Sequence, residues 1–338
     1  MSSLDIGIDL GTTSVIVYMH GKGIILREPS VVAVDTRNDT VIAVGKDAFE
    51  MVGKTPAYIS AVHPLKDGVI SDHVLTEYMI KEFLRKTSES LMIKPRVAIC
   101  VPSAITDVES RAVIRAATSA GARKVYLVEE PIAAAIGAGV NISEANGALV
   151  VDIGGGTTDV AIISLSGIVQ SDSIKIAGNT FDEAIVKYLR HKYKLLIGER
   201  MAEKIKIELA DVFHVSDEKT MDVKGRNLVT GLPQRLTIAQ SELLPCLREC
   251  CLGIINSIRR VLELAPPELV GDIHSNGIIL TGGGSLLCGL DKLIASYIKV
   301  EVRRADTPTD SVAIGTGNVF DFISDLNDGF VNASTYEH

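Results

Sequence analysis

Apolar and polar residues alternate in short blocks along the first 44 residues of the chain, and Gly and Asp separate the blocks. Blocks of this length, bounded by turn residues, predict the strands of a β-meander, at residues 4–10, 14–19, 23–26, 30–35 and 41–44. Apolar positions then recur at helical spacing over residues 74–86. A change from strand spacing to helix spacing within one stretch is typical of an α/β protein.

The same two patterns continue through the rest of the chain. Further apolar runs predict strands at 95–102, 125–128, 148–153, 159–164, 167–176 and 277–281. Thr106 and Glu109 have the spacing of a capping box, which predicts a helix start, and Gly121 can end that helix. Helical spacing predicts further helices at 131–138, 181–194, 200–213, 241–264 and 286–297, with Ser241 as an N-cap.

One short pattern occurs twice, once in each half of the chain. Residues 6–14 read IGIDLGTTS, and residues 150–159 read VVDIGGGTTD. Each copy is an apolar run, an Asp and a Gly/Thr turn, which together can present backbone N–H groups and hydroxyls to phosphate and a carboxylate to a metal ion. A single copy also occurs in plain hairpins. The repetition therefore favours two turns that clamp the phosphates of one nucleotide.

Composition narrows the class of protein. The net charge of −8 argues against a protein that grips nucleic acid by electrostatics, so we expect no nucleic-acid partner. No run of 18 apolar residues predicts a membrane-spanning helix, and the first residues lack the features of a signal peptide. The five cysteines have neither zinc spacing nor a disulfide framework, and we expect them to be reduced, as in a cytoplasmic protein.

The glycine-rich turns supply the residues that could contact Mg²⁺ and the phosphates. Asp9 and Asp152 are candidates for holding Mg²⁺, directly or through water, although each Asp can instead cap its own turn. The candidate phosphate contacts are Gly11, Thr12, Thr13, Gly154, Gly155, Gly156 and Thr157. A third glycine turn is expected to pass beneath a base or an α-phosphate just before a helix, at Gly282, Gly283, Gly284 and Ser285. The Walker spacing GxxxxGK[ST] is absent from the chain.

Three further groups have two interpretations each. Glu130, at a predicted strand end, can orient or deprotonate a water molecule, or it can simply complement a helix dipole. Glu203 and Lys206 can reach a ribose and a base, or they can form a solvated ion pair. The apolar residues Leu91, Met92 and Ile93 can pack into the core or insert shallowly into an anionic membrane.

Together these motifs resemble the ATPase superfamily of actin, heat-shock chaperones and sugar kinases. The chain is most similar to the MreB family of bacterial actin-like proteins over residues 4–325. Several stretches carry this resemblance: 23–32, 64–70, 152–159, 196–200, 231–233 and 266–269. The chain departs from the family at Gly11-Thr12-Thr13-Ser14, where many members read Gly-Thr-Ala-Asn, and at His63, where Arg is usual. The amphipathic N-terminal segment of some members is not expected, and the tail from 327 to 338 matches no family pattern.

The resemblance implies an actin-like fold with ATP and Mg²⁺ in a central cleft. Domain I would comprise a large subdomain (1–31, 66–141 and 316–338) and a small one (32–65). Domain II would comprise a large subdomain (142–180 and 238–315) and a small one (181–237). In this family Glu130 matches the residue that positions the hydrolytic water, Thr157 a γ-phosphate sensor, and Glu203 a ribose contact. Leu91, Met92 and Ile93 match a membrane-inserting loop.

The function implied is a slow ATPase that polymerises into membrane-associated filaments and determines cell shape. The partners implied are further copies of the chain in paired head-to-tail protofilaments, the inner face of the cell membrane, and membrane-bound wall-synthesis proteins. Three other interpretations remain open: a chaperone ATPase, a small-molecule kinase, and a scaffold that binds nucleotide without hydrolysing it. A chaperone would carry a further substrate domain, and a kinase would need an Asp base in a substrate pocket.

Overall fold

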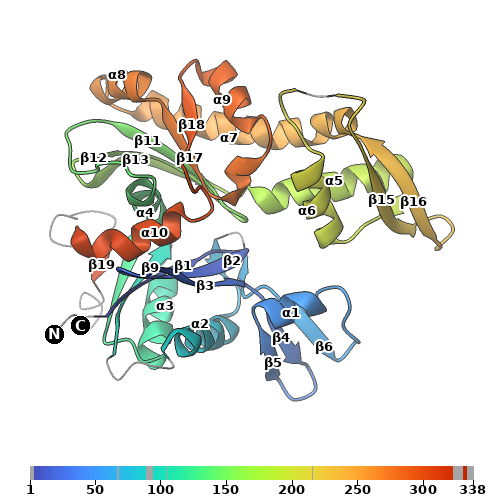
Figure 1. The fold of residues 1–338 in the computed structure, drawn as a ribbon, viewed down its shortest axis with the longest axis horizontal. Coiled ribbons are helices and arrows are strands. Elements are labelled where there is room, and N and C mark those ends of the chain that lie inside the picture. The colour runs from blue at the N-terminus through green and yellow to red at the C-terminus, as the bar shows by residue number, and fades with distance from the viewer. Residues whose placement is uncertain are drawn as a thin grey trace.

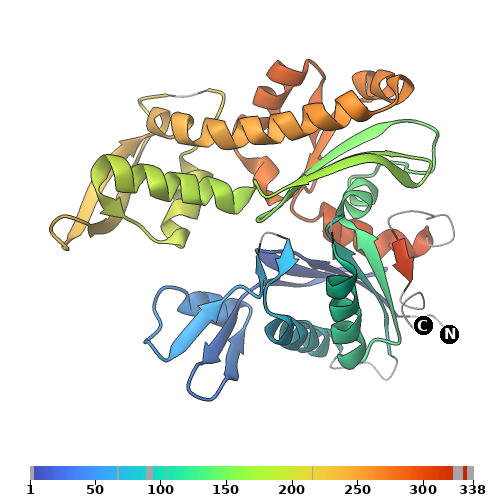
Figure 2. The same ribbon diagram turned by 180° about the vertical axis from the view of Figure 1, so that it is seen from behind.

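The computed structural model describes residues 4–66, 68–88, 94–103, 105–214, 216–322 and 330–332. Two large mixed sheets, each with its own helices, form the two halves of the molecule, which we call domain I and domain II (Figure 1). Each half carries a smaller sheet at the same end of the molecule, seen from behind in Figure 2. The polypeptide crosses between the halves at residues 138–147 and again at residues 305–310.

The sheet of domain I has the strand order β19-β10-β9-β1-β2-β3. Strand β1 is parallel to β9 and antiparallel to β2. Alternate residues of β9 face opposite sides: Val97 and Ile99 pack with helices α2 and α3, whereas Ala98 and Cys100 pack with α4. The bounds of these elements are β1 (Asp5–Leu10), β2 (Ser14–Met19), β3 (Gly23–Pro29), α2 (His73–Ser88), β9 (Arg96–Val101), α3 (Asp107–Ser119), β10 (Lys124–Glu129), α4 (Glu130–Gly137) and β19 (Phe330–Asn332).

The sheet of domain II repeats this plan in the order β13-β12-β11-β17-β18. Its central strand β11 is antiparallel to β12 and parallel to β17, as β1 is to β2 and β9. One face packs on α5, α7 and α9, and the other packs on α4. The bounds are β11 (Ala148–Ile153), β12 (Thr158–Ser164), β13 (Gly167–Ile174), α7 (Leu244–Leu264), α8 (Pro267–Asn276), β17 (Ile278–Thr281), η2 (Gly283–Leu286), α9 (Leu290–Ile298) and β18 (Val302–Arg304).

The small subdomains are insertions after β3 and β13. The first contains β4 (Val32–Asp35), β5 (Thr40–Val44), α1 (Lys46–Met51) and β6 (Ile59–Val62), and a short β7 (Leu65–Lys66) and β8 (Val69–Ile70) follow it. The second contains α5 (Gly178–Tyr193), β14 (Leu195–Leu196), α6 (Glu199–Glu208), β15 (Thr220–Asn227), β16 (Pro233–Ala239) and η1 (Gln240–Leu243). The first small subdomain has a core of its own with only three buried residues, Val31, Ala33 and Ala48, whereas the buried side chains of the second belong to the main core of domain II.

One apolar cluster joins the two domains. Helix α10 (Ser311–Asn318), followed by η3 (Val319–Asp321), packs against α4, and both helices lie between the two large sheets. Their side chains share a single core with Tyr126 of one sheet and Ile163 of the other. The helices meet closely, because a Cβ added at Gly315 would overlap the carbonyl oxygen of Ala133, and one at Gly137 would overlap that of Ser311. The two halves are therefore one continuous packed unit.

The predicted strands are confirmed, and so is the capping box, in which Thr106 Oγ1 accepts from Glu109 N at 3.3 Å. Three helix predictions were wrong at their ends. The helix predicted over 200–213 ends at Glu208, because the Asp211 carboxylate accepts the backbone N–H groups of Phe213 and His214 in a separate turn. The helix predicted over 286–297 begins at Leu290, after Gly289 with a φ of 78°.

The third wrong end is at Ser241. This residue lies inside the 3-10 turn η1, and the α-helix α7 begins only at Leu244. The cap is formed by Glu242 instead, whose carboxylate accepts the backbone N–H of Ala239 at 2.9 Å. Helices α1, α8 and α10 were not predicted at all.

Candidate functional site

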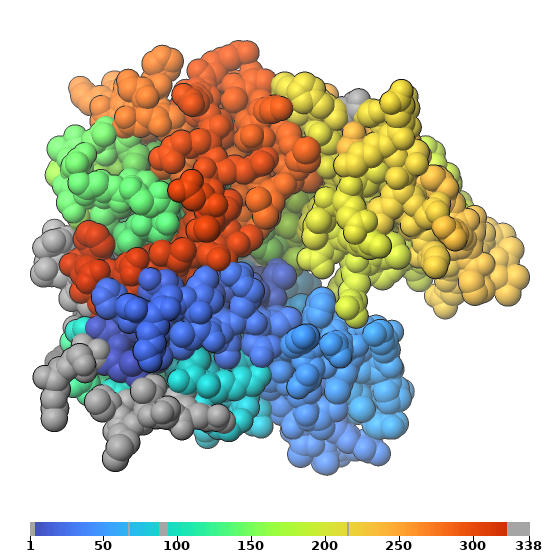
Figure 3. Space-filling model, viewed as in Figure 1, coloured from blue at the N-terminus to red at the C-terminus, as the bar shows by residue number. Residues whose placement is uncertain are grey.

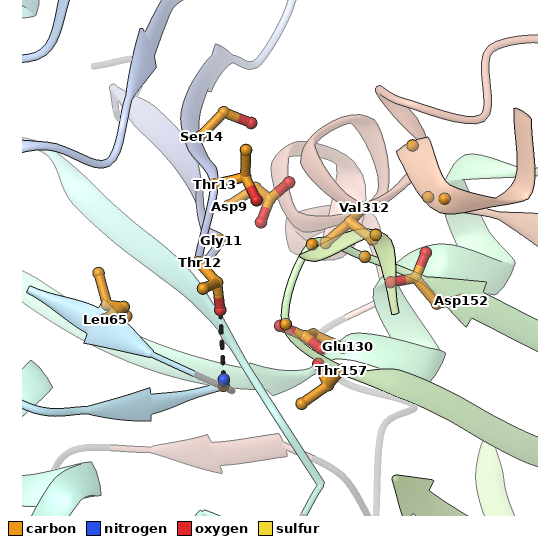
Figure 4. A pocket seen from close by; sticks show the side chains of 18 of the residues that line it. Asp9, Gly11, Thr12, Thr13, Ser14, Leu65, Glu130, Asp152, Thr157 and Val312 are labelled. Atoms are coloured by element: carbon orange, nitrogen blue, oxygen red, sulfur yellow. Dashed lines mark hydrogen bonds between the residues drawn. The ribbon is translucent and has the colours of Figure 1, made fainter. Parts of the chain in front are cut away.

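The two Gly/Thr turns lie opposite each other, each at the end of the central strand of its sheet. We call Gly11–Thr13, after β1, the first turn and Gly154–Thr157, after β11, the second turn. A Cβ added at Gly155 would overlap the hydroxyl oxygen of Thr13, so the turns approach each other closely. Figure 4 shows Asp9 and the first turn on one side, with Asp152, Glu130 and Thr157 on the other. The duplicated motif therefore converges on one place.

Between the turns lies a cleft of about 410 Å³. The residues that line it come from both domains and from α6 of the second small subdomain. They include every predicted metal, phosphate and catalytic residue except Ser285: Asp9, Gly11, Thr12, Thr13, Glu130, Asp152, Gly154, Gly155, Gly156, Thr157, Glu203, Lys206, Gly282, Gly283 and Gly284. Ser285 is fully buried behind its turn, where its hydroxyl donates to the carbonyl oxygen of Gly282 at 2.6 Å. Leu91, Met92 and Ile93 lie outside the described residues.

Two carboxylates in the cleft, those of Asp9 and Asp152, lie close enough for the charge of Asp152 to act on Asp9. Burial and the charge of Asp152 raise the pKa of Asp9 to about 7. Burial also raises the pKa of Asp152 to about 7, although Thr281 Oγ1 donates a hydrogen bond to Asp152 Oδ1 at 2.7 Å and opposes the shift. Carboxylates that are disfavoured in their charged form become favourable ligands once a cation is present. The pair therefore fits a hard divalent cation such as Mg²⁺.

The protein offers that cation few ligands. Among the residues that the structure describes, no group of three or more His, Cys, Asp or Glu side chains could hold a metal ion. Mg²⁺ commonly keeps several waters and takes one or two carboxylates plus substrate phosphates. The donor set therefore fits Mg²⁺ that arrives with a nucleotide and is held mainly through water.

Glu130 is the first residue of α4 and faces the second turn. Pro131 follows it within the first helical turn, where a missing N–H costs nothing, so the strand passes directly into the helix. Burial and the nearby charges of Asp159, Asp152 and Asp9 raise the pKa of Glu130 well above its usual value. A carboxyl group in this position has the perturbed pKa that is typical of a general base or a water-positioning residue.

Sequence reasoning missed two charged residues of this region. Asp159, on β12, is 1% exposed, and burial raises its pKa beside Glu130. Its position at the end of the second repeated motif was the available signal. Arg27, on β3, lines the cleft and pairs with Asp310 across the two domains at 2.5 Å. No pattern in the sequence connects Arg27 with Asp310, because the two residues meet only in the folded chain.

Helix α6 brings Glu203 and Lys206 to the cleft. Lys206 Nζ donates to the carbonyl oxygen of Gly178 at 3.0 Å and to Asp182 Oδ2 at 2.7 Å. Burial raises the pKa of Asp182 to about 6, and the charge of Lys206 opposes that shift. Lys206 therefore forms an ion pair that joins α6 to α5. The sequence interpretation of a solvated ion pair had instead paired Lys206 with Glu203.

The third glycine turn closes the cleft from domain II. Gly282 has a φ of 77°, and a Cβ there would overlap the backbone of Ile153. Glycine is thus required for the turn to pack against β11. The helix expected to start near Ser285 begins only at Leu290, and the four-residue 3-10 turn η2 follows the glycine turn instead. The turn can therefore offer a close backbone surface to a ligand, but no α-helix N-terminus.

The duplicated sheets, the joined α4–α10 core and the shared cleft define the actin-like fold, and two solved structures have the same arrangement. The crystal structure of MreB5 of Spiroplasma citri bound to AMPPNP is 38% identical, with a TM-score of 0.90 over 96% of this chain and 98% of that one. The structure of the same protein bound to ADP is 36% identical, with a TM-score of 0.91 over 100% of this chain and 99% of that one.

The sequence comparisons identify the family. The family model for MreB/Mbl protein matches residues 3–328. The cell shape-determining protein Mbl of Bacillus subtilis is 51% identical over 327 residues, which cover 96% of this chain and 98% of that protein. The chain belongs to the MreB/Mbl family of cell shape-determining proteins, and the predicted family and fold are confirmed.

Proposed function

We propose that this protein binds ATP with Mg²⁺ in the cleft and hydrolyses it slowly. The observation that carries the proposal is the pair of matched Gly/Thr turns that face each other across the cleft, the first with the half-buried Asp9 and the second with the buried Asp152. The relatives solved with AMPPNP and with ADP support the choice of an adenine nucleotide. Bound Mg²⁺ would neutralise the phosphate oxygens and stabilise charge in the transition state.

Each group of residues in the cleft would have its own role in binding or hydrolysis. Asp9 and Asp152 would hold the waters of Mg²⁺, and the N–H groups and hydroxyls of the two turns would bind the β- and γ-phosphates. Thr157 would contact the γ-phosphate, and Glu203 the ribose. Glu130 would orient the attacking water in line with the γ-phosphate and would accept a proton from that water. The glycines of the third turn would lie against the α-phosphate or the base.

Replacement of one carboxylate tests the hydrolysis step. In Glu130→Gln we expect ATP affinity to remain and phosphate release to fall by about 10²- to 10⁴-fold, the usual contribution of a positioned acid–base group. Glu129→Gln is the matched control, because Glu129 precedes Glu130 in the chain but does not line the cleft. Phosphate release and nucleotide affinity are measured on both variants. Undiminished phosphate release from Glu130→Gln would refute the assigned role.

We also propose that the protein assembles into head-to-tail protofilaments, which pair and lie on the inner face of the cell membrane. Membership of a cell shape-determining family supports this assembly. A contact between two different surfaces of one chain does not close on itself and so produces a filament. In the described part of the chain no helix is long and apolar enough to span a bilayer. The proposed route to the membrane is association through the apolar segment Leu91–Ile93, strengthened by filament avidity.

Negative-stain electron microscopy with Mg-ATP, with and without anionic liposomes, tests the assembly. Paired filaments that lie on the lipid are the expected result. Dispersed particles at all salt and nucleotide conditions would favour the alternative of a monomeric ATPase of the same superfamily. Filaments that form in solution but ignore the liposomes would refute only the membrane association.

A further inference from the structure

A cation–π contact joins the two small subdomains across the molecule. The guanidinium carbon of Arg200, on α6, lies 5.0 Å from the centre of the Phe49 ring, on α1. Arg200 is exposed, and Phe49 is half-buried against the core of its own subdomain. In Figure 3 the yellow part of the chain that includes α6 meets the blue part that includes α1. The contact therefore bridges two insertions that come from different domains.

On the domain II side, backbone hydrogen bonds connect this contact to the second turn. Gly178 N donates to the carbonyl oxygen of Gly154 at 3.0 Å, and Asn179 N donates to that of Gly155 at 2.8 Å. Lys206 Nζ in turn donates to the carbonyl oxygen of Gly178 at 3.0 Å. Since Lys206 and Arg200 are on the same short helix, the position of the second turn sets the position of Arg200.

On the domain I side, a second series of hydrogen bonds connects it to the first turn. Ser30 N donates to the carbonyl oxygen of Thr13 at 3.0 Å, and the next residue, Val31, accepts from Gly45 N at 2.9 Å. Phe49 N donates to the carbonyl oxygen of Gly45 at 2.9 Å. The ring of Phe49 is thus attached through α1 to the first turn. Both turns of the cleft are linked to the two partners of a single contact.

We infer that Arg200 and Phe49 form a latch that closes across the small subdomains when nucleotide holds the two turns together, and that slows nucleotide release. This inference rests on the proposed binding of nucleotide in the cleft. Neither residue lines the cleft, so their effect on release is through the position of α6 and α1. They are positioning residues and take no part in the chemistry.

The release rate of tritium-labelled ADP with Mg²⁺, chased by unlabelled ADP at a protein concentration too low for assembly, tests the latch. A cation–π contact at an exposed site corresponds to about a two- to fivefold change in rate, so Arg200→Gln is expected to release ADP about two- to fivefold faster. Because Arg200 is exposed, this variant retains the fold. Phe49→Leu keeps an apolar side chain in its subdomain and is expected to have the same effect.

The double variant and a control make the test specific. If the two residues act only through each other, Arg200→Gln with Phe49→Leu releases ADP no faster than either single variant. Arg259→Gln removes a similar contact, 5.6 Å above the Tyr297 ring on domain II, and is expected to release ADP at the wild-type rate. Wild-type release from Arg200→Gln, or effects that multiply in the double variant, would overturn the latch. Failure of the wild-type protein to retain ADP at all would overturn the proposed nucleotide binding itself.

Discussion

At the scale of single residues, the shape of the cleft depends on a glycine that lets the two turns approach each other. A methyl group at Gly155 would overlap the Thr13 hydroxyl and push the two turns apart. We expect Gly155→Ala to weaken nucleotide affinity by about 1–3 kcal/mol, the usual cost of overpacking a close contact. Isothermal titration calorimetry with Mg-ADP measures the effect.

The matched control for this prediction is another glycine of domain II. Gly198 precedes α6 and has open space around the position of a Cβ, with nothing within 4 Å. Gly198→Ala is therefore expected to bind nucleotide as the wild type does. Equal affinity of Gly155→Ala and the wild type would contradict the close approach of the turns.

Sequence reasoning at this scale selected residues that line the cleft where a motif repeats, and it missed residues that meet only in the folded chain. Asp9 and Asp152 were found because the same apolar run, carboxylate and turn occur twice. Asp159 and Arg27 were missed because their place beside the cleft depends on strand pairing and on a contact between domains. Ser285 was placed in the site because it follows three glycines, yet its hydroxyl satisfies its own turn.

At the scale of elements, side chain–backbone hydrogen bonds decide where helices begin and end. Glu242 holds η1 against α5: its carboxylate accepts from Ala239 N at 2.9 Å, from the Tyr188 hydroxyl at 3.0 Å and from Lys192 Nζ at 2.5 Å. Burial opposes the charged form, but these hydrogen bonds outweigh it and lower the pKa of Glu242 to about 2. A carboxylate with a lowered pKa stabilises the folded state whenever it is ionised.

We therefore expect Glu242→Gln to lower the free energy of unfolding by about 1–3 kcal/mol at pH 7. In the unfolded chain Glu242 has the ordinary pKa of 4.5, whereas in the folded protein its pKa is about 2. Between these two values the folded protein keeps the carboxylate charged while the unfolded chain binds a proton. The stabilisation is thus complete above the higher of these values, and the difference from the wild type should shrink as the pH falls towards 2. Urea unfolding at pH 7, 4 and 3 measures the difference.

The control lies on α5, the helix whose Tyr188 and Lys192 contact Glu242. Glu183 is 65% exposed in its ion pair with Lys187, so Glu183→Gln is expected to change stability little at any of these pH values. A Glu242→Gln variant whose stability differed from that of the wild type by the same amount at every pH would contradict the role of the charge.

Most elements were predictable from the period of their apolar residues, and the exceptions have a physical cause. Strands β1, β2, β9 and β11 followed directly from short apolar runs. Helix α10 was not predicted, because Gly315 and Gly317 are typical of turns and weaken a helix. The structure uses the small size of Gly315 to bring α10 against the backbone of α4. This close packing is a contact between two helices distant in sequence, so no local pattern in the sequence indicates it.

At the scale of the whole molecule, the second small subdomain presents an apolar hairpin tip. Val229 is 78% exposed and Leu232 is 64% exposed between β15 and β16. The tip is held in shape by Asn227 Oδ1, which accepts Val229 N at 2.7 Å and Thr230 N at 2.9 Å. The hairpin lies at one end of the long axis of the molecule, away from α8 (Figure 1). A fixed apolar tip at one end is suited to an end-to-end contact between copies.

We expect Val229→Asp to abolish filaments while ADP affinity stays unchanged, because a charge would have to be buried in each contact. Val74→Asp is the control: Val74 is 76% exposed at the start of α2, where an acidic residue suits the helix dipole. Sedimentation with Mg-ATP and electron microscopy measure assembly. Normal filaments from Val229→Asp would exclude the hairpin tip from the contact.

The duplication of the molecule was predictable from the two turn motifs, whereas the relation between its halves was not. Both sheets were indicated by the repeated apolar run and turn. Their mutual position is set by the core around α4 and α10, whose members come from four distant parts of the chain. Contacts of this kind have no fixed spacing in the sequence.

The two chain crossings between the halves meet at one point, where α4 ends at Gly137 and α10 begins at Ser311. If the halves rotate relative to each other, two connections at a common point restrict that rotation to one axis. A change of ligand in the cleft would then change one quantity, the angle between the two domains. In a polymer the same small angle would recur in every subunit, so that a difference too small to matter in one molecule would accumulate into a bend or twist of the whole filament.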